Sequence, residues 1–167
     1  MKIKTLLIRG FLTGCFCLGT TDSPSVAEAV DLFCMAEAIY FESRGEADIG
    51  QLAVGITIKN RFKHPKYPAS ICGVVRQGKY SKGVPLRDKC QFSYWCDGRP
   101  EKIEDHEAWT KALDLAKLIL DTTLEISGLE NVTHYHSNKV QPRWSRKLTY
   151  KKTVGRHLFY AKKRSGL

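Results

Sequence analysis

The sequence predicts an α+β domain that is mainly helical and carries a small antiparallel sheet or hairpin near its C-terminus. Three segments within the first 122 residues place apolar side chains at helical spacing, and after Gly128 the pattern changes to short runs of alternating apolar and polar residues. A length of 167 residues and a hydrophobic share of 43% suit one globular domain and leave no room for a second full domain.

The N-terminus is predicted to be an export signal. Basic residues flank or interrupt an apolar stretch that becomes clean from Phe11 to Gly19, and Ala27-Glu28-Ala29 then supplies the small residues of a cleavage site. We therefore assign residues 1–29 to a secretory signal peptide and residues 30–167 to the mature domain. The expected location is the periplasm or the outside of the cell.

Two alternatives for the N-terminus stay open. Residues 1–29 could form a flexible or helical extension, since Arg9 interrupts the apolar run. Alternatively, Leu12-Thr13-Gly14-Cys15 resembles a lipoprotein processing box, which would leave a lipid tether on Cys15. No other stretch approaches the roughly 18 consecutive apolar residues of a membrane span.

The helical segments and strands follow in order along the chain. Residues from Val30 to about Ser43 are apolar nearly all round, which is typical of a buried helix. A second helix is expected from the N-cap candidate Asp48 to Phe62, where Pro65 and Pro68 close it. The remaining predicted elements are a short helical turn at 69–75, a helix at 105–122, and strands at 132–136, 148–150 and 157–160.

Residues 77–100 are predicted to form a long, glycine-rich loop tied by cysteine. Loops of this length inside a compact domain are usually binding or catalytic, so this one is a candidate substrate wall. The even set of Cys34, Cys72, Cys90 and Cys96 in an exported protein suggests one or two disulfides, and the best single guess is a bridge within Cys72, Cys90 and Cys96. A four-cysteine zinc site is the competing interpretation, although closely spaced CxxC pairs are lacking.

The chain is strongly basic, with 27 Lys and Arg against 17 Asp and Glu, a net charge of +10 and a pI near 9.4. This balance favours a polyanionic partner such as nucleic acid, an anionic membrane surface or a cell wall polymer. Much of the basicity lies in the C-terminal part, from Arg143 to Arg164. Because the chain carries no helix-turn-helix, zinc-finger or RNA-binding signature, we do not expect nucleic acid to be the partner.

Glu42 is the strongest candidate for a catalytic residue. It lies at the end of the nearly all-apolar first helix, where burial would penalise the ionised carboxylate and raise its pKa. A raised pKa is what a glycosidase general acid requires near neutral pH. The plainer alternative is a helix-terminal Glu42 that pairs with Arg44 or a neighbouring lysine.

Three separated blocks of the sequence resemble the SleB-type cell wall hydrolases, which include spore-cortex-lytic enzymes. The blocks run from Ala38 through Glu46 to Arg61, from Cys90 to Gly98, and from Thr133 through Trp144 to Tyr160. The family's fold is lysozyme-like and related to that of lytic transglycosylases. The resemblance covers nearly all of residues 30–167 and implies that they form a cell wall hydrolase catalytic domain acting on peptidoglycan, with no cofactor and as a monomer.

The resemblance places Glu42 at the position of the family's essential acid. It implies cleavage of the glycan strand between N-acetylmuramic acid and N-acetylglucosamine, and Glu42-Ser43 resembles the Glu-Ser pair of lytic transglycosylases. In that mechanism one carboxyl protonates the glycosidic oxygen and then accepts the proton of the muramic acid 6-hydroxyl, which closes a 1,6-anhydro ring. Hydrolysis by the same acid stays open as an alternative outcome.

Other residues are expected to support the acid or contact the sugar. We interpret Glu46 mainly as a cap of the next helix or as a group that orients Arg44, because Gly45 separates it from the helix of Glu42. Glu46 and Asp97 are nevertheless the two candidates for the second carboxylate that a paired mechanism needs. The expected groove residues are Gln91, Phe92, Ser93, Tyr135 and Trp144.

Two functions of other classes are weighed against glycan cleavage. His134 and His136 would point to one face of a strand, and with His157 and a carboxylate they could bind zinc for a wall amidase or peptidase. No HExxH motif is present, so we expect these histidines to be hydrogen-bonded and His134 to support the site. The other alternative is a non-catalytic wall-binding module that uses the basic face.

Overall fold

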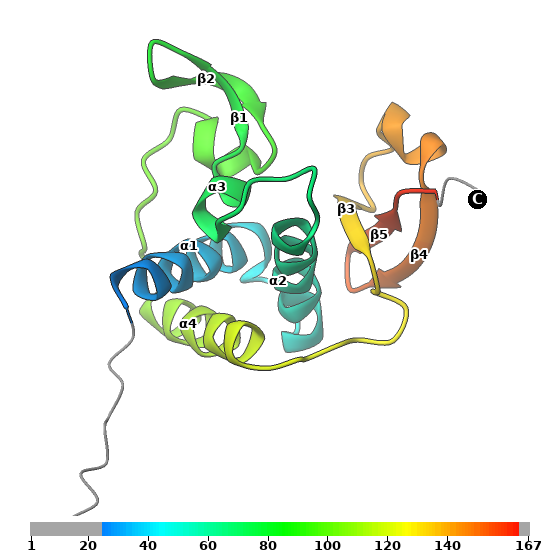
Figure 1. Cartoon of the computed structure of the whole chain (residues 1–167), viewed down its shortest axis with the longest axis horizontal. Helices are drawn as coiled ribbons and strands as arrows, with labels where there is room; N and C mark the ends of the chain where they lie inside the picture. The colour runs from blue at the N-terminus through cyan, green and yellow to red at the C-terminus, as the bar shows by residue number, and fades with distance from the viewer. Residues whose placement is uncertain (1–24, 164–167) are drawn as a thin grey trace, which may run out of the picture.

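The computed structural model describes residues 25–163. Its helical body consists of α1 (Val26–Ser43), α2 (Asp48–Lys63), the short α3 (Ile71–Val75) and α4 (His106–Asp121). In Figure 1, α1 lies among the other three helices and packs against each of them. Met35, Ala36, Ala38 and Ile39 are fully buried there, which explains why the predicted first helix is apolar nearly all round.

Helix α1 begins four residues earlier than the predicted start at Val30. Ser25 and Glu28 form a capping box, in which the backbone N–H of Ser25 donates to the Glu28 carboxylate at 2.7 Å and the N–H of Glu28 donates to Ser25 Oγ at 3.3 Å. Residues 26–29, which we assigned to the export signal, therefore form the first turn of α1. The rest of the predicted signal and the Cys15 tether site lie outside the described residues.

The other helices match their predicted ranges closely. Asp48 is the first residue of α2 rather than its N-cap, which is Ala47, and the Asp48 carboxylate instead accepts from Lys111 Nζ of α4 at 3.0 Å. Asp105 caps α4 by accepting from the backbone N–H of Ala108 at 3.0 Å. None of the helices in residues 25–163 has the length and apolar character to cross a lipid bilayer.

The predicted loop at 77–100 is wrong in its first half. Residues 78–90 form the hairpin of β1 (Gly78–Ser81) and β2 (Val84–Cys90), and the 3₁₀ helix η1 (Ser93–Cys96) follows. Both strands lie mostly exposed, so their side chains do not alternate between a core and solvent, and the pattern that predicts strands is absent.

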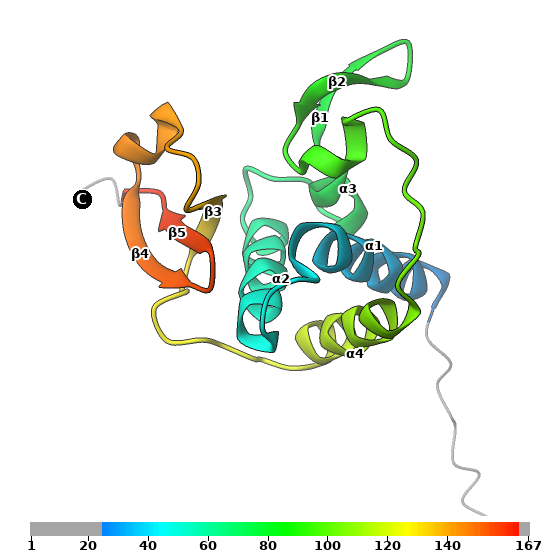
Figure 2. The ribbon, with the colours of Figure 1, turned by 180° about the vertical axis from the view of Figure 1, so that it is seen from behind.

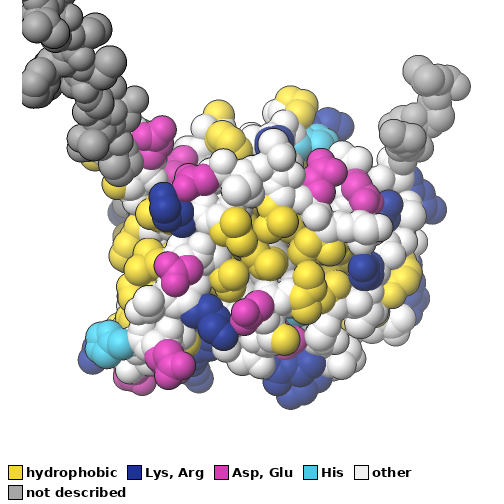
Figure 3. Space-filling model, turned by 90° about the horizontal axis from the view of Figure 1, so that it is seen from below, with side chains coloured by type: hydrophobic (Ala, Val, Ile, Leu, Met, Phe, Trp, Pro, Cys, Tyr) yellow, Lys and Arg dark blue, Asp and Glu magenta, His cyan; other side chains and the backbone are white. Residues whose placement is uncertain are grey.

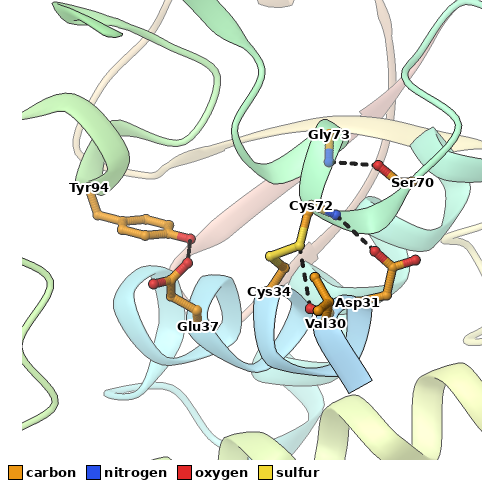
Figure 4. The surroundings of a disulfide bond; sticks show 8 residues. All are labelled: Val30, Asp31, Cys34, Glu37, Ser70, Cys72, Gly73 and Tyr94. Carbon is orange, nitrogen blue, oxygen red and sulfur yellow. Dashed lines mark hydrogen bonds between the residues drawn. A yellow bond between two sulfur atoms is a disulfide. The ribbon is translucent and has the colours of Figure 1, made fainter. Parts of the chain in front are cut away.

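Two disulfides hold the helical body and the hairpin. Cys90–Cys96 ties the end of β2 to η1, which confirms the predicted bridge within Cys72, Cys90 and Cys96. The second disulfide, Cys34–Cys72, joins α1 to α3, and Figure 4 shows it between these helices. Since all four sulfurs are paired, the four-cysteine zinc site is wrong.

The second layer is a three-stranded antiparallel sheet of β3 (Val132–Ser137), β4 (Thr149–Val154) and β5 (His157–Ala161), in the order β3-β5-β4. The 3₁₀ helix η2 (Arg143–Lys147) lies between β3 and β4 in the chain. The structure thus confirms the α+β class and the C-terminal antiparallel sheet.

Within the helical body, α2 lies between the other helices and the sheet, as Figure 2 shows from behind. Val54 and Ile58 belong to the core around α1, whereas Ala53 and Ile56 pack with Phe159 and its neighbours in a second core. The amide of Asn60 donates to the carbonyls of Leu129 and Val132 at 3.1 and 3.0 Å. These contacts fix β3 relative to α1, and so fix the two elements that build the site.

One face of the helical body remains partly apolar. Figure 3, which views the molecule from the side of α4, shows hydrophobic side chains gathered in the middle of this face. Elsewhere along the helices, the first turn of α1, Phe62, Ile71 and Leu120 line a hollow of 530 Å³. Glu42 is not among the residues that line this hollow.

Candidate active site

Glu42 lies in the last turn of α1, where two hollows meet. The sheet-side hollow has a volume of 360 Å³ and the loop-side hollow one of 610 Å³. Both are lined by Phe41, Glu42 and Arg44. The sheet-side hollow adds Ser43, Gly45, Glu46, Ser137, Lys139, Arg156 and His157; the loop-side hollow adds Ser93, Tyr94, Asp97, Arg99, Pro100, Glu101, Lys102 and Glu104. A carboxyl at such a junction has binding space on both sides, as cleavage within a polymer requires.

The surroundings of Glu42 favour a protonated carboxyl. Burial raises the pKa of Glu42 above its ordinary value, and this effect outweighs three influences that lower it. These are a hydrogen bond from Tyr135, the charge of Arg61 and the backbone of Ser93. The Tyr135 hydroxyl donates to Glu42 Oε2 at 3.0 Å, so β3 fixes the orientation of an acid that α1 supplies.

Arg61 of α2 is a buried cation close to this acid. Its side chain is 4% exposed, and its Nε donates to the carbonyl of Thr133 at 2.7 Å. Its guanidinium lies over the rings of Phe92 and Tyr67 at 5.2 and 5.6 Å, while Nη1 has no hydrogen-bond partner among the described residues. A buried charge with so few partners stabilises a nearby carboxylate, and Arg61 accordingly lowers the pKa of Glu42.

Glu46 has a different partner from the predicted one. Burial raises its pKa, but hydrogen bonds and the charge of Arg156 outweigh burial, and the net shift is downward. The Arg156 side chain donates to Glu46 Oε1, and the Arg156 backbone N–H donates to Oε2 at 3.1 Å. Glu46 therefore neither orients Arg44 nor caps α2. It is an ionised carboxylate, which suits a structural tie or a base and not a general acid.

The ion pair between Glu46 and Arg156 requires a glycine at position 155. Gly155 has a φ of +56°, and a Cβ at position 155 would overlap the Glu46 carboxylate. The turn between β4 and β5 thus places Arg156 and His157 in the sheet-side hollow by closing directly onto Glu46.

The predicted groove residues of the 90–97 segment divide into two groups. Ser93 and Asp97 line the loop-side hollow, and Asp97 Oδ1 accepts from the backbone N–H of Arg99 at 2.8 Å. Gln91 is exposed but lines neither hollow, and Phe92 is 1% exposed and packs under Arg61. The expectation that the Phe92 ring faces a sugar is therefore wrong; Tyr94 lies in the hollow instead and stacks on Phe41 at 4.8 Å.

The expected aromatic residues of the sheet also differ in place. Tyr135 contacts the acid, as described, whereas Trp144 lies outside both hollows and packs against His134, His136 and Tyr160. The His134 ring hydrogen-bonds with Thr133 Oγ1 at 2.9 Å, so it faces this aromatic cluster and not the acid. The stacking role predicted for Trp144 and a direct site role for His134 are not supported by their positions.

The histidines are engaged in hydrogen bonds and packing. His136 Nε2 pairs with the Tyr160 hydroxyl at 3.0 Å, and His157 packs edge-on against Tyr135. Within residues 25–163, no three side chains of His, Cys, Asp or Glu are grouped so that they could hold a metal ion. The zinc interpretation of His134, His136 and His157 has no geometric support in this part of the chain.

The two residues that follow Glu42 have distinct environments. Ser43 is buried, and its hydroxyl donates to the carbonyl of Ile39 at 2.8 Å, which anchors the last turn of α1. Arg44 is exposed and lies over the Tyr40 ring at 4.8 Å. Arg44 lines both hollows and is free to meet a ligand, since it does not pair with Glu42 within 4.0 Å.

Sequence reasoning missed several residues around the acid. Arg61, Tyr94, Lys139 and Arg156 come from four separate elements or turns, and no local pattern connects them to Glu42. Glu37 was also missed as a buried acid: it is 6% exposed, burial raises its pKa, and the Tyr94 hydroxyl donates to it at 3.4 Å, as Figure 4 shows. Its place on the buried face of α1 was the available signal.

Comparison with known proteins places this arrangement in a family. The sequence profile of the Cell Wall Hydrolase family matches residues 45–160, a range that begins three residues after Glu42. A spore cortex-lytic enzyme of Halalkalibacterium halodurans is 40% identical over 142 residues, which cover 83% of this chain and 37% of that protein. The chain therefore spans little more than a third of that relative. A spore cortex-lytic enzyme of Bacillus subtilis is 42% identical over 45 residues, or 27% of this chain and 15% of that protein.

Two solved structures share the fold. The catalytic domain of the germination-specific lytic transglycosylase SleB from Bacillus anthracis has a TM-score of 0.59 and 24% identity, covering 83% of this chain and 99% of that one. The catalytic domain of the Bacillus cereus SleB protein has a TM-score of 0.56 and 25% identity, covering 85% of this chain and 98% of that one. The sequence match over residues 45–160 and the shared fold lead to one conclusion: the chain belongs to the cell wall hydrolase family.

Proposed function

We propose that this protein cleaves the glycan strand of peptidoglycan between N-acetylmuramic acid and N-acetylglucosamine, with Glu42 as the acid. The observation that carries the proposal is a carboxyl of raised pKa, held by Tyr135, at the junction of two hollows. The bond to be cleaved would lie over Glu42, with sugars on either side. The family membership and the SleB catalytic domains of the same fold support the substrate class.

The chemistry that we propose is a lytic transglycosylation with one carboxyl. The protonated Glu42 donates to the glycosidic oxygen while the bond from that oxygen to C1 of the muramic acid breaks and positive charge develops on the sugar. The Glu42 carboxylate then accepts the proton of the 6-hydroxyl, whose oxygen bonds to C1 and forms the 1,6-anhydro ring. The enzyme regains its proton, and no water is consumed.

The electrostatics of the site support this two-way proton transfer. Burial favours the protonated form of Glu42 by raising its pKa, and Arg61 with the Tyr135 hydroxyl stabilises the carboxylate that exists between the two transfers. Glu46 is occupied by Arg156, which favours a single acid over a pair of cooperating carboxylates.

We further propose that the protein acts outside the cytoplasm, where its substrate lies. Two disulfides support this location, because such bridges persist in oxidising compartments and are rare in the cytosol. The first turn of α1 includes residues 26–29, so cleavage of a signal at residue 29 would remove part of a capped helix. N-terminal sequencing of the exported protein locates the processing site.

Mass spectrometry of the products tests the proposed reaction. Purified sacculi are incubated with the enzyme, and soluble muropeptides with 1,6-anhydro ends should appear, each one water lighter than the product of a hydrolytic muramidase run in parallel. Full-mass reducing ends would show hydrolysis and overturn the transglycosylase chemistry. Release of free stem peptides, or loss of activity with a chelator, would support a metal-dependent amidase or peptidase and overturn glycan cleavage.

A further inference from the structure

The net charge of the chain is confined to its last part. All 17 Asp and Glu precede Val132 and are matched there by as many Lys and Arg, so residues 132–167 carry the whole net charge of +10. Among the described residues this segment comprises β3, η2, β4 and β5, and we call residues 132–163 the cationic module. A separation of charge this complete within one fold points to a surface that meets an anionic partner.

The structure presents these charges to solvent beside α2. Figure 1 shows the sheet on the α2 side of the molecule, with β3 next to α2 and η2 on the far side of the strands. The basic residues of the module are all exposed, and two of them face carboxylates: Arg156 pairs with Glu46, and Lys151 lies 3.8 Å from Glu130. Within the described residues, Lys139, Arg143, Arg146 and Lys147 have no carboxylate within 4.0 Å. Their charge is available to a ligand.

The cationic module is continuous with one end of the proposed substrate groove. Ser137, Lys139, Arg156 and His157 belong to it and line the sheet-side hollow together with Glu42. The loop-side hollow is mixed in charge, since Asp97, Glu101 and Glu104 accompany Arg99 and Lys102. A strand bound over Glu42 would thus leave the groove across a cationic surface on the sheet side only.

We propose that the cationic module binds the carboxylates of peptide stems on the glycan strand that occupies the groove, and so holds the polymer across Glu42. This inference rests on the proposed function. Stems recur along a strand at every muramic acid, and each carries free carboxylates, so several weak contacts act on one molecule and their effects multiply. The module offers single charges spread over a sheet and η2, which suits a repeated ligand better than a single anion.

A membrane surface fits the module less well. A surface helix that binds lipid presents a broad apolar face beside its basic residues, whereas the large apolar side chains that the module exposes are Val140 and Tyr150. Because the module adjoins the hollow at Glu42, a glycan strand bound there would place its peptide stems on the module. Lipid and nucleic acid have no such connection to the hollow.

The test uses a triple charge reversal on η2, Arg143→Glu with Arg146→Glu and Lys147→Glu, none of which lines either hollow. The matched control reverses Lys63 at the end of α2, Lys66 in the loop that follows and Lys82 in the hairpin turn; all three are exposed, and the net charge changes equally. Binding of each protein to intact sacculi is measured by sedimentation in a Glu42→Gln background over a series of salt concentrations.

The η2 variant should bind sacculi at least about tenfold more weakly at low salt and show a shallower salt dependence, whereas the control should change less than about twofold. In the active background KM should rise for the η2 variant with kcat unchanged. Glycan strands freed of their stems by an amidase, which keep only the lactyl carboxylate that the cleavage leaves on each muramic acid, should bind the unreversed protein more weakly than soluble strands that keep their stems.

Three outcomes would overturn the proposal. If the η2 variant and the control bound sacculi equally well, the module would have no part in binding peptidoglycan. Undiminished binding to stem-free glycan would show that the stem carboxylates are not the ligand. Tighter, η2-dependent binding to vesicles of anionic lipid or to duplex DNA than to sacculi would assign the surface to another partner. If sacculi bind through η2 while no muropeptides are released, this inference holds and the proposed catalysis fails.

Discussion

At the scale of single residues, the proposed mechanism makes activity depend on the pKa of Glu42. The acid must carry its proton to start the reaction, so activity should persist below the pKa of Glu42 in the folded protein and fall as the pH rises through it. Because burial raises this pKa, the fall is expected at a higher pH than for an ordinary glutamate.

Tyr135→Phe tests how the hydroxyl tunes the acid. The hydrogen bond from Tyr135 lowers the pKa of Glu42, so its loss should move the alkaline limb of kcat/KM to higher pH. We also expect kcat at the optimum to fall about tenfold, because the carboxyl loses the contact that orients it. A profile of kcat/KM against pH checks both effects, and an alkaline limb that moves to lower pH would contradict the assignment.

Arg61 should act on the acid through its charge. Arg61→Met removes the charge that lowers the pKa of Glu42 and should shift the alkaline limb upward, whereas Arg61→Lys keeps the charge and should leave the limb nearly in place. Arg61→Met also removes the donor to the Thr133 carbonyl and should unfold about 1–3 kcal/mol more easily. Equal pH profiles for the two variants would show that Arg61 serves only the fold.

At the scale of elements, the Gly155 turn joins the sheet to Glu46. Gly155→Ala should destabilise the protein by about 2–3 kcal/mol and lower activity, because the new methyl group meets the Glu46 carboxylate and displaces the Arg156 pair. Gly83→Ala is the matched control: Gly83 also has a positive φ, +81°, but a Cβ there has no atom within 4 Å. Both variants carry the strain of a positive φ, and only Gly155→Ala adds the contact with Glu46, so the difference between their thermal melts measures that contact. Equal losses of stability in the two variants would contradict the account.

The two disulfides should differ in their contribution to stability. Cys34–Cys72 spans 38 residues and joins two helices, whereas Cys90–Cys96 spans 6 residues within one turn. Loop-closure entropy predicts about 4 kcal/mol for the first and about 2 kcal/mol for the second. Denaturant unfolding of the Cys34→Ser/Cys72→Ser and Cys90→Ser/Cys96→Ser variants tests the order, and a larger loss for the second pair would reverse it.

Sequence patterns predicted those elements that bury one face. The ranges of α2, α4, β3 and β5 follow from their apolar periodicity, whereas β4 is exposed up to Thr153 and extends four residues beyond the predicted end at Tyr150. The β1–β2 hairpin could not be predicted in this way, since its strands expose both faces. The start of α1 was assigned to the export signal because Ala27-Glu28-Ala29 fits a cleavage site as well as a capped helix turn.

The sequence alone identified the part of the candidate site that lies on a single helix, α1. Glu42 stands out because a carboxylate ends an apolar helix, and this requires no knowledge of the fold. The contact of Glu42 with Tyr135 joins residues 93 positions apart, and the pairing of Glu46 with Arg156 joins residues 110 apart, so no spacing reveals them. Phe92 was misassigned because its burial under Arg61 depends on how η1 packs against α2.

At the scale of the whole molecule, the fold separates two tasks. The helical body supplies the acid and the loop-side hollow, and the sheet supplies Tyr135, the sheet-side hollow and the net positive charge. Helix α2 connects them through Asn60 and Arg61. The hydrogen bond between Tyr135 and Glu42 therefore forms only when the sheet docks on the helical body, so the proposed catalysis depends on the integrity of the whole domain.

The most direct test of this account is the rate at which Glu42→Gln releases muropeptides from purified sacculi. Gln keeps the shape of the side chain but cannot donate the proton, and general acid catalysis contributes about 10²–10⁴-fold, so the rate should fall by at least 100-fold while thermal stability and binding to sacculi are retained. Glu46→Gln is the matched control and should show a milder defect. If Glu42→Gln kept more than about a tenth of the wild-type rate, a barrier change below about 1.4 kcal/mol, Glu42 would not be the acid.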